Sequence, residues 1–182
     1  MDHRANVIGF MCGTWIFGKL ATAQYITNMM KELFTPLADV IFEKADKSLF
    51  NSFCHKYDGK GNVPITQMFI GAITSGEESH LEYAKYAIEK MLKLGADPNG
   101  LSGINSETCI DIAVNSIYNG SYNQSTNTQK FKVGIIEMLI NYGAEITEKT
   151  NKIIKDNPSI KDMIKDALKQ YARKQMEYDA PY

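Results

Sequence analysis

The sequence of 182 residues is poor in the residues that build metal centres and disulfide frameworks. Its three cysteines, Cys12, Cys54 and Cys109, are widely separated, so they allow at most one bridge, and only in an oxidising compartment. Its three histidines lack the i, i+4 spacing of a zinc-binding helix. Glycine-rich nucleotide-binding loops are also missing. We therefore expect neither a metal nor a cofactor.

The sequence also has no large excess of charge of one sign and no long apolar run. A net charge of −1 gives no general attraction to nucleic acid, so we exclude a nucleic-acid partner. The apolar run from Val7 to Gly18 is too short to span a membrane, and we expect no integral membrane segment. With Arg4 before it and Ala21-Thr22-Ala23 after it, the run fits either a buried first helix, which we favour, or a secretory signal.

Signs of catalysis are weak. Cys54-His55 suggests a thiol and its base, but sequence neighbours seldom face one another, and we prefer a structural cysteine beside a surface histidine. The loop at 58–62 lacks the glycine and glutamate that a calcium loop requires at its sixth and twelfth positions. We predict that the protein is not an enzyme.

What the sequence does contain is helical periodicity, with apolar residues recurring every three or four positions and almost no strand alternation. It predicts an all-α fold of stacked helical hairpins. Ser79 and Glu82 have the spacing of a capping box, and Gly95 and Gly143 suit the left-handed residue that ends a helix. The other predicted elements are a helix over Val63–Ile73, a helix led by Ser106, a polar stretch at 119–129, a helix over Phe131–Asn141 and a last helix starting at Asn157-Pro158-Ser159.

Two of these helices end in related sequences, Leu-Gly-Ala-Asp-Pro-Asn and Tyr-Gly-Ala-Glu-Ile-Thr, which indicates a repeat. The first of these endings and the segment Thr108-Cys109-Ile110-Asp111-Ile112-Ala113 resemble the ankyrin repeat over residues 95–144, with cysteine in place of the usual proline. This resemblance implies ankyrin-like central repeats and a protein-binding role. Gly95 and Gly143 are 48 positions apart, whereas ankyrin periods are near 33 residues. The hairpin helices are therefore either lengthened or joined by a long loop.

The predicted organisation is an N-terminal helical region (1–94), an ankyrin-like repeat (95–150) and C-terminal capping helices (151–182), in one continuous domain. A terminal unit of a stack must show a polar side to water. Lys161, Lys165, Lys169 and Arg173 supply it here. We interpret these residues as a solvated face, because Asp162 and Asp166 lie among them; a basic patch for an acidic partner is the alternative.

A second resemblance covers residues 9–92. The segment from Phe10 to Gly18 is similar to the Cys-x-Gly-Tyr-Ile-x-Gly helix of the Rap/Tai-type immunity proteins, and Phe53-Cys54 with the helices after it follow in the same order. These small helical bacterial proteins protect against type VI secretion toxins. The resemblance implies that Cys12 and Cys54 are candidates for a disulfide and that the protein is periplasmic. The later cysteine of that family is missing, since the sequence has Gly95-Ala96-Asp97 there.

The candidate contact residues lie in two polar loops. Tyrosine offers a large contact area with a polar end, so we assign Tyr118, Asn119, Tyr122 and Asn123 to partner binding. The alternative is that Tyr118 covers the core and Tyr122 is incidental. Asp58 and Lys60 are further candidates in the other loop. The resulting hypothesis is a toxin-neutralising immunity protein; the alternative is a general ankyrin-type adaptor or secreted effector, which would be cytoplasmic if not exported.

Overall fold

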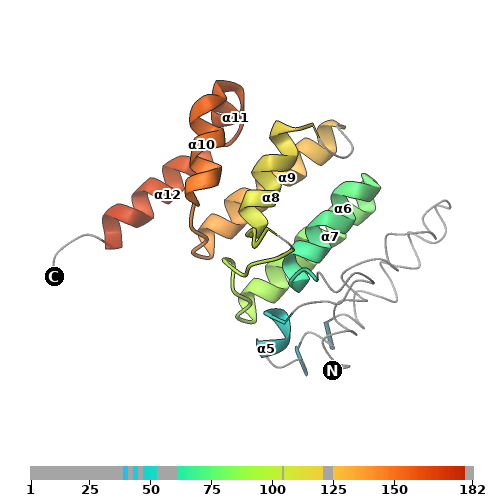
Figure 1. Ribbon diagram of the computed structural model, residues 1–182. Helices are drawn as coiled ribbons and strands as arrows, with labels where there is room; N and C mark the ends of the chain where they lie inside the picture. Colours follow the sequence, from blue (N-terminus) through green and yellow to red (C-terminus); the bar gives the residue numbers. More distant parts are fainter. Residues whose placement is uncertain are drawn as a thin grey trace.

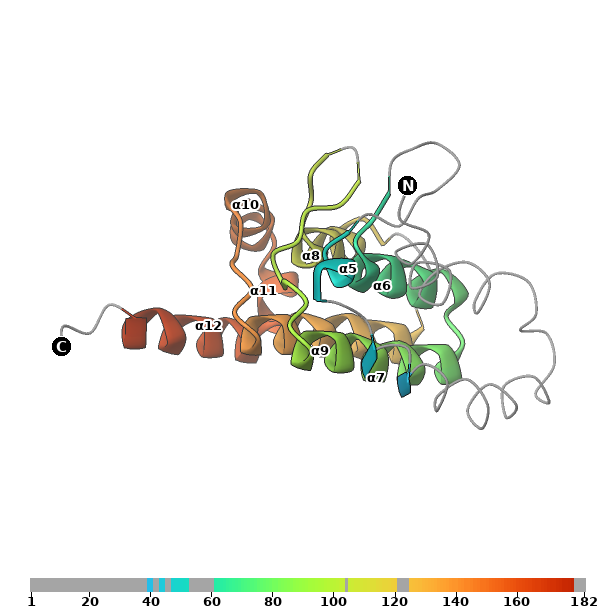
Figure 2. The same cartoon turned by 90° about the horizontal axis from the view of Figure 1, so that it is seen from below.

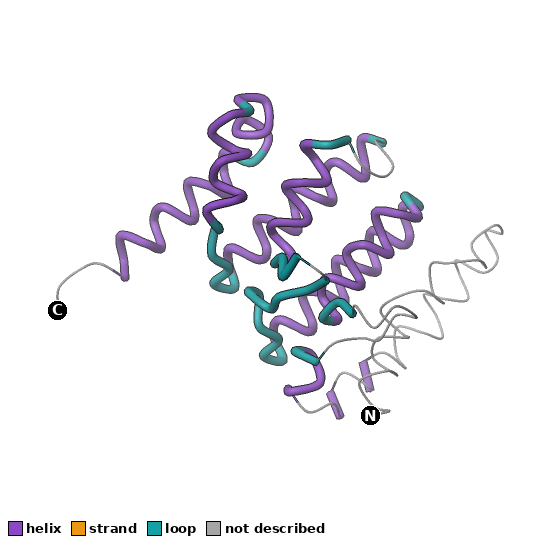
Figure 3. Tube along the Cα trace, in the orientation of Figure 1, coloured by secondary structure: helices purple, strands orange, loops and turns teal. Residues whose placement is uncertain are grey.

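The computed structural model describes residues 39–40, 43–44, 47–52, 61–103, 105–120 and 125–178. Within these ranges the chain is helical and has no strand, although Ser102 and Glu107 form an isolated antiparallel bridge (Figure 3). The predicted all-α class is therefore confirmed. The described helices are α5 (Lys47–Phe50), α6 (Pro64–Ser75), α7 (Glu78–Lys93), α8 (Cys109–Tyr118), α9 (Thr126–Asn141), α10 (Glu148–Asp156), α11 (Pro158–Met163) and α12 (Lys165–Tyr178).

The helices lie in two layers (Figures 1 and 2). Helix α6 packs on α7 and α8 packs on α9, so each pair forms a hairpin. In the inner layer α8 lies between α6 and α10, and in the outer layer α9 lies between α7 and α12. The two hairpins therefore stack side by side, with α10 to α12 at the C-terminal end. None of the described helices is both long and apolar enough to cross a lipid bilayer.

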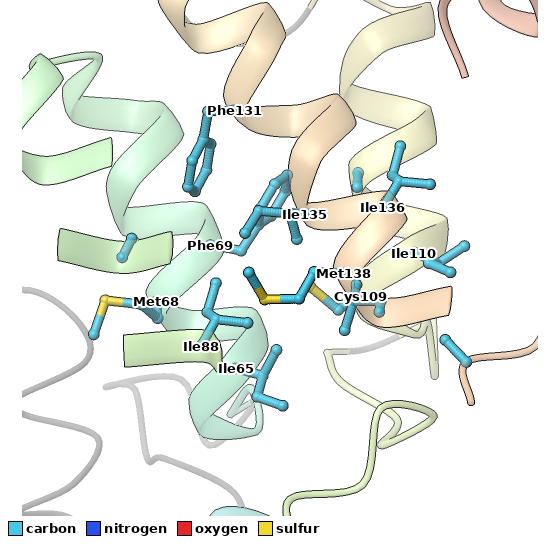
Figure 4. Packing of buried hydrophobic residues seen from close by; sticks show 14 of the residues in the cluster. Ile65, Met68, Phe69, Ile88, Cys109, Ile110, Phe131, Ile135, Ile136 and Met138 are labelled. Carbon is cyan, nitrogen blue, oxygen red and sulfur yellow. The ribbon is translucent and has the colours of Figure 1, made fainter. Parts of the chain in front are cut away.

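One apolar cluster runs through the stack, from Leu49 to Ala167 (Figure 4). At its centre the rings of Phe69 and Phe131 stack with centroids 5.8 Å apart and link the two hairpins. Burial of each such large side chain contributes about 1.5–3 kcal/mol.

Helices α7 and α9 end in the same way. The amide of Gly95 donates to Leu92 O and that of Ala96 to Met91 O; the amides of Gly143 and Ala144 donate to Ile140 O and Leu139 O. Both glycines have the left-handed conformation, with φ of 96° and 92°. These are the two hydrogen bonds of the Schellman motif. The predicted glycine-terminated ends are confirmed.

Two predicted helix starts are wrong. Helix α7 begins at Glu78, with Glu77 as its N-cap, so Ser79 lies inside the first turn instead of capping it. Ser106 does not lead α8; it has φ of 50° in the turn between Ser102 and Glu107. Thr108 is the N-cap of α8 and forms a capping box with Asp111.

The polar stretch between α8 and α9 is shorter than predicted. Ser125 caps α9 by accepting a hydrogen bond from the amide of Thr128, and the helix begins at Thr126, five residues before Phe131. Part of the predicted polar stretch is therefore helical. The predicted helix start at Asn157-Pro158-Ser159 is confirmed, but the chain breaks at Ile164, so two helices, α11 and α12, replace the single predicted helix.

Candidate protein-binding surface

The two central helices of the inner layer, α6 and α8, expose no charge. Helix α6 has no acidic or basic residue, and the one carboxylate of α8, Asp111, is buried. The residues of α6 and α8 that are not buried carry no formal charge: Thr74 and Tyr118 are exposed, and Ile70, Gly71, Ser75, Ile112 and Asn115 are partly buried. By contrast, α7 carries six acidic or lysine residues along its length. Depletion of charge is typical of the centre of protein interfaces.

The described part of the predicted contact site lies at one end of this uncharged face. Tyr118, the last residue of α8, is 52 % exposed. Asn119 is the C-cap, and its Nδ2 donates to Asn115 Oδ1 at 2.8 Å. The other candidates, Tyr122, Asn123, Asp58 and Lys60, lie outside the described residues, as do Cys12 and Cys54, so those assignments stay predictions.

A projecting loop, described over residues 99–103 and 105–107, borders the other end of the uncharged face (Figure 2). The antiparallel bridge between Ser102 and Glu107 holds the two sides of this loop together. Its base is tied to the start of α6, because Val63 N donates to Ser102 Oγ at 2.9 Å. The loop exposes the apolar side chain of Leu101 together with Asn105 and Ser106. Face and loop thus form an angled surface that is uncharged along the helices.

The contacts that hold successive loops together repeat along the chain. Asn99 Oδ1 accepts from Glu145 N at 2.8 Å, and Asn51 Oδ1 accepts from Asp97 N at 2.9 Å. Donors and acceptors are both 48 positions apart, like Gly95 and Gly143. The sequence did not reveal Asn51, because the residues before it lack the Gly-Ala signature.

Asp111 is a buried carboxylate surrounded by threonines. Its Oδ2 accepts from Thr108 N at 2.9 Å and from Thr108 Oγ1 at 3.0 Å, and its Oδ1 accepts from Thr150 Oγ1 at 2.7 Å and from Thr147 Oγ1. Burial alone would raise the pKa of Asp111, but these hydrogen bonds outweigh it and hold the pKa below its usual value. The ionised group joins α8 to α10, which is a structural role.

The other buried ionisable side chains are also parts of the packed fold. Burial raises the pKa of the Cys109 thiol to about 12, so the thiol is not a nucleophile at neutral pH. His80 Nδ1 lies 2.5 Å from Ser75 Oγ, and burial lowers its pKa. Lys132 Nζ donates to Ser116 O at 3.0 Å, and its pKa is lowered by burial. Within the described ranges no three His, Cys, Asp or Glu side chains gather as metal ligands would.

Sequence reasoning missed most of the uncharged face, including Ile70, Ile112 and Asn115. The absence of charge from 64–75 and from 109–118, apart from Asp111, is visible in the sequence and was the available indication. Comparison of the chain with protein-family models, with curated proteins and with solved structures found no match.

Proposed function

We propose that this chain is a non-enzymatic protein-binding module whose contact surface is the uncharged face of α6 and α8 with the projecting loop 99–107. The observation that carries the proposal is the segregation of charge: α6 and α8 expose none, while α7 carries charge along its length. An exposed helix face without charge can be desolvated by a partner at low cost, since no ion loses its hydration.

An ankyrin-like arrangement supports this proposal. Hairpins stacked in two layers, glycine-ended outer helices and loops joined by Asn51 and Asn99 are the features that an ankyrin-like stack would need. Such stacks create extended recognition surfaces because each unit adds area to the same side. The spacing of 48 residues departs from the usual ankyrin period.

The proposal is tested by adding charge to the face. Thr74→Lys and Asn115→Lys each place an ammonium group on it, and Gln175→Lys on α12 is the matched control at an exposed position of the outer layer. Partners are captured from lysate with the tagged full-length chain and identified by mass spectrometry. We expect both face variants to weaken the capture of a specific partner by at least about tenfold, because each buries an unpaired charge, and the control to retain it. A partner retained equally by all three variants would place the binding surface elsewhere.

The toxin-immunity hypothesis is a sharper form of the same proposal, supported by the N-terminal resemblance over residues 9–92. An exported immunity protein is expected to contain a Cys12–Cys54 disulfide, which leaves Cys109 as its one thiol, whereas a cytosolic adaptor would have three. Thiol titration in denaturant of protein purified from its native host distinguishes the two. Three free thiols would count against export. Co-purification with the product of a neighbouring gene would identify the toxin.

A further inference from the structure

The chain contains two Asn-Gly pairs, Asn99-Gly100 and Asn119-Gly120, which have different surroundings in the fold. An asparagine followed by glycine can lose its side-chain amide without an enzyme, because glycine has no Cβ to keep its backbone nitrogen away from the asparagine side chain. The reaction requires the side chain and the following peptide group to rotate toward each other. Contacts that hold either group therefore slow it, and the two pairs allow a comparison within one molecule.

Asn99-Gly100 is held at the side chain and at the backbone. Asn99 Nδ2 donates to Gly143 O at 3.2 Å, and Asn99 Oδ1 accepts from Glu145 N at 2.8 Å. Asn99 N donates to Asp97 Oδ1 at 2.8 Å, and Gly100 N donates to Asp97 O at 3.2 Å. Both residues of the pair are partly buried. The reactive arrangement at Asn99 therefore requires the junction between two units of the stack to open.

Asn119-Gly120 lies at the end of α8, and both of its residues are exposed. Asn119 Nδ2 donates to Asn115 Oδ1 at 2.8 Å within the same helix, and Gly120 N donates to Ile117 O at 3.3 Å. Asn119 has helical backbone angles, φ −77° and ψ −4°, so attack on its side chain follows fraying of this last turn. Helix ends open at little cost in free energy, and here no junction between units has to open with them.

We propose that Asn119 is a site of spontaneous deamidation and that the fold protects Asn99 from the same reaction. Gly120 N loses its proton to hydroxide and attacks Asn119 Cγ. The bond between Cγ and Nδ2 breaks, and the leaving nitrogen takes a proton from water and departs as ammonia. Water then adds to one of the two carbonyl carbons of the resulting cyclic imide and opens it to aspartate or isoaspartate. In sum, one water is consumed and one ammonia is released.

The product places a carboxylate beside Tyr118, at the end of the uncharged face. It also brings negative charge to the C-terminal end of α8, where the helix dipole disfavours it. The reaction requires only water and this helix end, so the inference does not depend on the proposed binding role of the face.

The test follows both asparagines in the full-length chain during incubation at mildly alkaline pH. A glutamate-specific protease, used at mildly acidic pH, cuts after Glu107 and so places Asn99 and Asn119 in different peptides, in which mass spectrometry locates each deamidation. We expect Asn119 to react at least about tenfold faster than Asn99 in the folded protein, because both side-chain hydrogen bonds of Asn99 to the next unit must break first.

The unfolded chain is the control. In guanidinium chloride both pairs lose their contacts, and we expect the two rates to become comparable. Equal rates at Asn99 and Asn119 in the folded protein would overturn the proposal. An Asn119 that stays unchanged in the folded protein, over a time in which the unfolded chain reacts, would also overturn it.

Two further measurements identify the mechanism. In water enriched in heavy oxygen, the product at Asn119 is expected to include isoaspartate and to carry one solvent oxygen, since both follow from the cyclic imide. Asn119→Gln keeps an amide on a longer side chain that closes a ring less readily, so deamidation at this position is expected to fall at least about tenfold, with Asn99 unaffected. Aspartate without isoaspartate, or undiminished deamidation of the glutamine variant, would contradict attack by Gly120 N.

Discussion

At the scale of single residues, the carboxylate of Asp111 is the polar group on which the C-terminal half depends. Hydrogen bonds from Thr108, Thr147 and Thr150 compensate its burial. Removal of the carboxylate would leave those donors buried without an acceptor. We expect Asp111→Ala to lower the free energy of unfolding by about 3 kcal/mol, measured by urea denaturation at pH 7. A loss below about 1 kcal/mol would show that the threonines find other acceptors.

The variant Asp111→Asn keeps the shape of the side chain and removes its negative charge. Because the pKa of Asp111 is lowered in the folded state, its ionisation stabilises the fold above the unfolded-state pKa of about 3.9, and this contribution is lost as the pH falls through the lower folded-state value. The asparagine variant lacks this titration. We therefore expect the stability difference between wild type and Asp111→Asn to shrink between pH 5 and pH 2, measured by denaturation at both ends. A difference independent of pH would contradict an ionised carboxylate.

His80 is a base and Asp111 is an acid, but both are expected to make the folded protein less stable as the pH falls. Burial lowers its pKa in the folded chain, with Glu77 opposing, so below about 6.5 the unfolded chain binds a proton that the folded chain does not. Stability is expected to fall as the pH drops from 7 to 5, and His80→Gln should reduce that slope. His3 and His55 are present in both the wild type and the His80→Gln variant, so they do not contribute to the difference between the two slopes. Identical slopes in urea denaturation at the two pH values would refute the assignment.

At the residue scale, the sequence also predicted only part of the hydrogen-bond network around Asp111. The segment from Thr108 to Asp111 was recognised as the start of a repeat helix. Its partners Thr147 and Thr150 were not, because they lie more than 35 positions away and meet Asp111 only when α10 stacks on α8. Spacing along a sequence predicts local hydrogen bonds well; distant ones require the arrangement of the helices.

At the scale of elements, two glycines of α9 have opposite roles. Gly134 lies inside the helix and Gly143 follows its end with φ of 92°, and an added Cβ meets no atom within 4 Å at either position. We expect Gly134→Ala to stabilise the protein by about 0.5–1 kcal/mol through helix propensity. Gly143→Ala should destabilise it by about 1 kcal/mol, because alanine disfavours the left-handed conformation. Thermal unfolding of the pair checks the prediction, and shifts of the same sign would contradict it.

Helix ends marked by glycine could be predicted from the sequence, and helix starts were harder. Gly95 and Gly143 have few alternatives at a left-handed position, so they identify the ends. The first turn of α9 begins with Thr126 and Asn127, which are exposed and polar and so add nothing to the apolar period of the helix. Ser79 and Glu82 have capping spacing, but the helix begins earlier, where Ser75 Oγ accepts from Glu77 N. When several residues that could cap a helix lie close together, the sequence does not show which of them is the N-cap; the packing of the helix decides it.

At the scale of the whole molecule, the fold class follows from periodicity, whereas the surfaces do not. Apolar stripes predict stacked helices because each stripe needs another to cover it. Which face of a helix is exposed depends on the order of stacking: α6 lies in the inner layer, packed on α7 of the outer layer and beside α8, so its uncharged side becomes a surface.

The coupling between successive units can be tested through the asparagine that joins their loops. Asn99 Nδ2 donates to Gly143 O at 3.2 Å, and its Oδ1 accepts from Glu145 N, so it holds the connection that leads into α10. In a stack each unit is stabilised by its neighbours, and a weakened junction loosens the terminal side first. We expect Asn99→Ala to accelerate amide hydrogen exchange in α10 to α12 by roughly fivefold, equivalent to about 1 kcal/mol, while α6 and α7 change less.

The matched control is Asn119→Ala, which removes a hydrogen bond to Asn115 at the end of one helix and joins no two units. It is expected to leave exchange in α10 to α12 unchanged. Uniform acceleration across all helices by Asn99→Ala would mean that the molecule opens as one cooperative block. In that case the repeated asparagine contacts would contribute to global stability without defining separate units, and the stack would behave as a single domain whose ends cannot loosen independently.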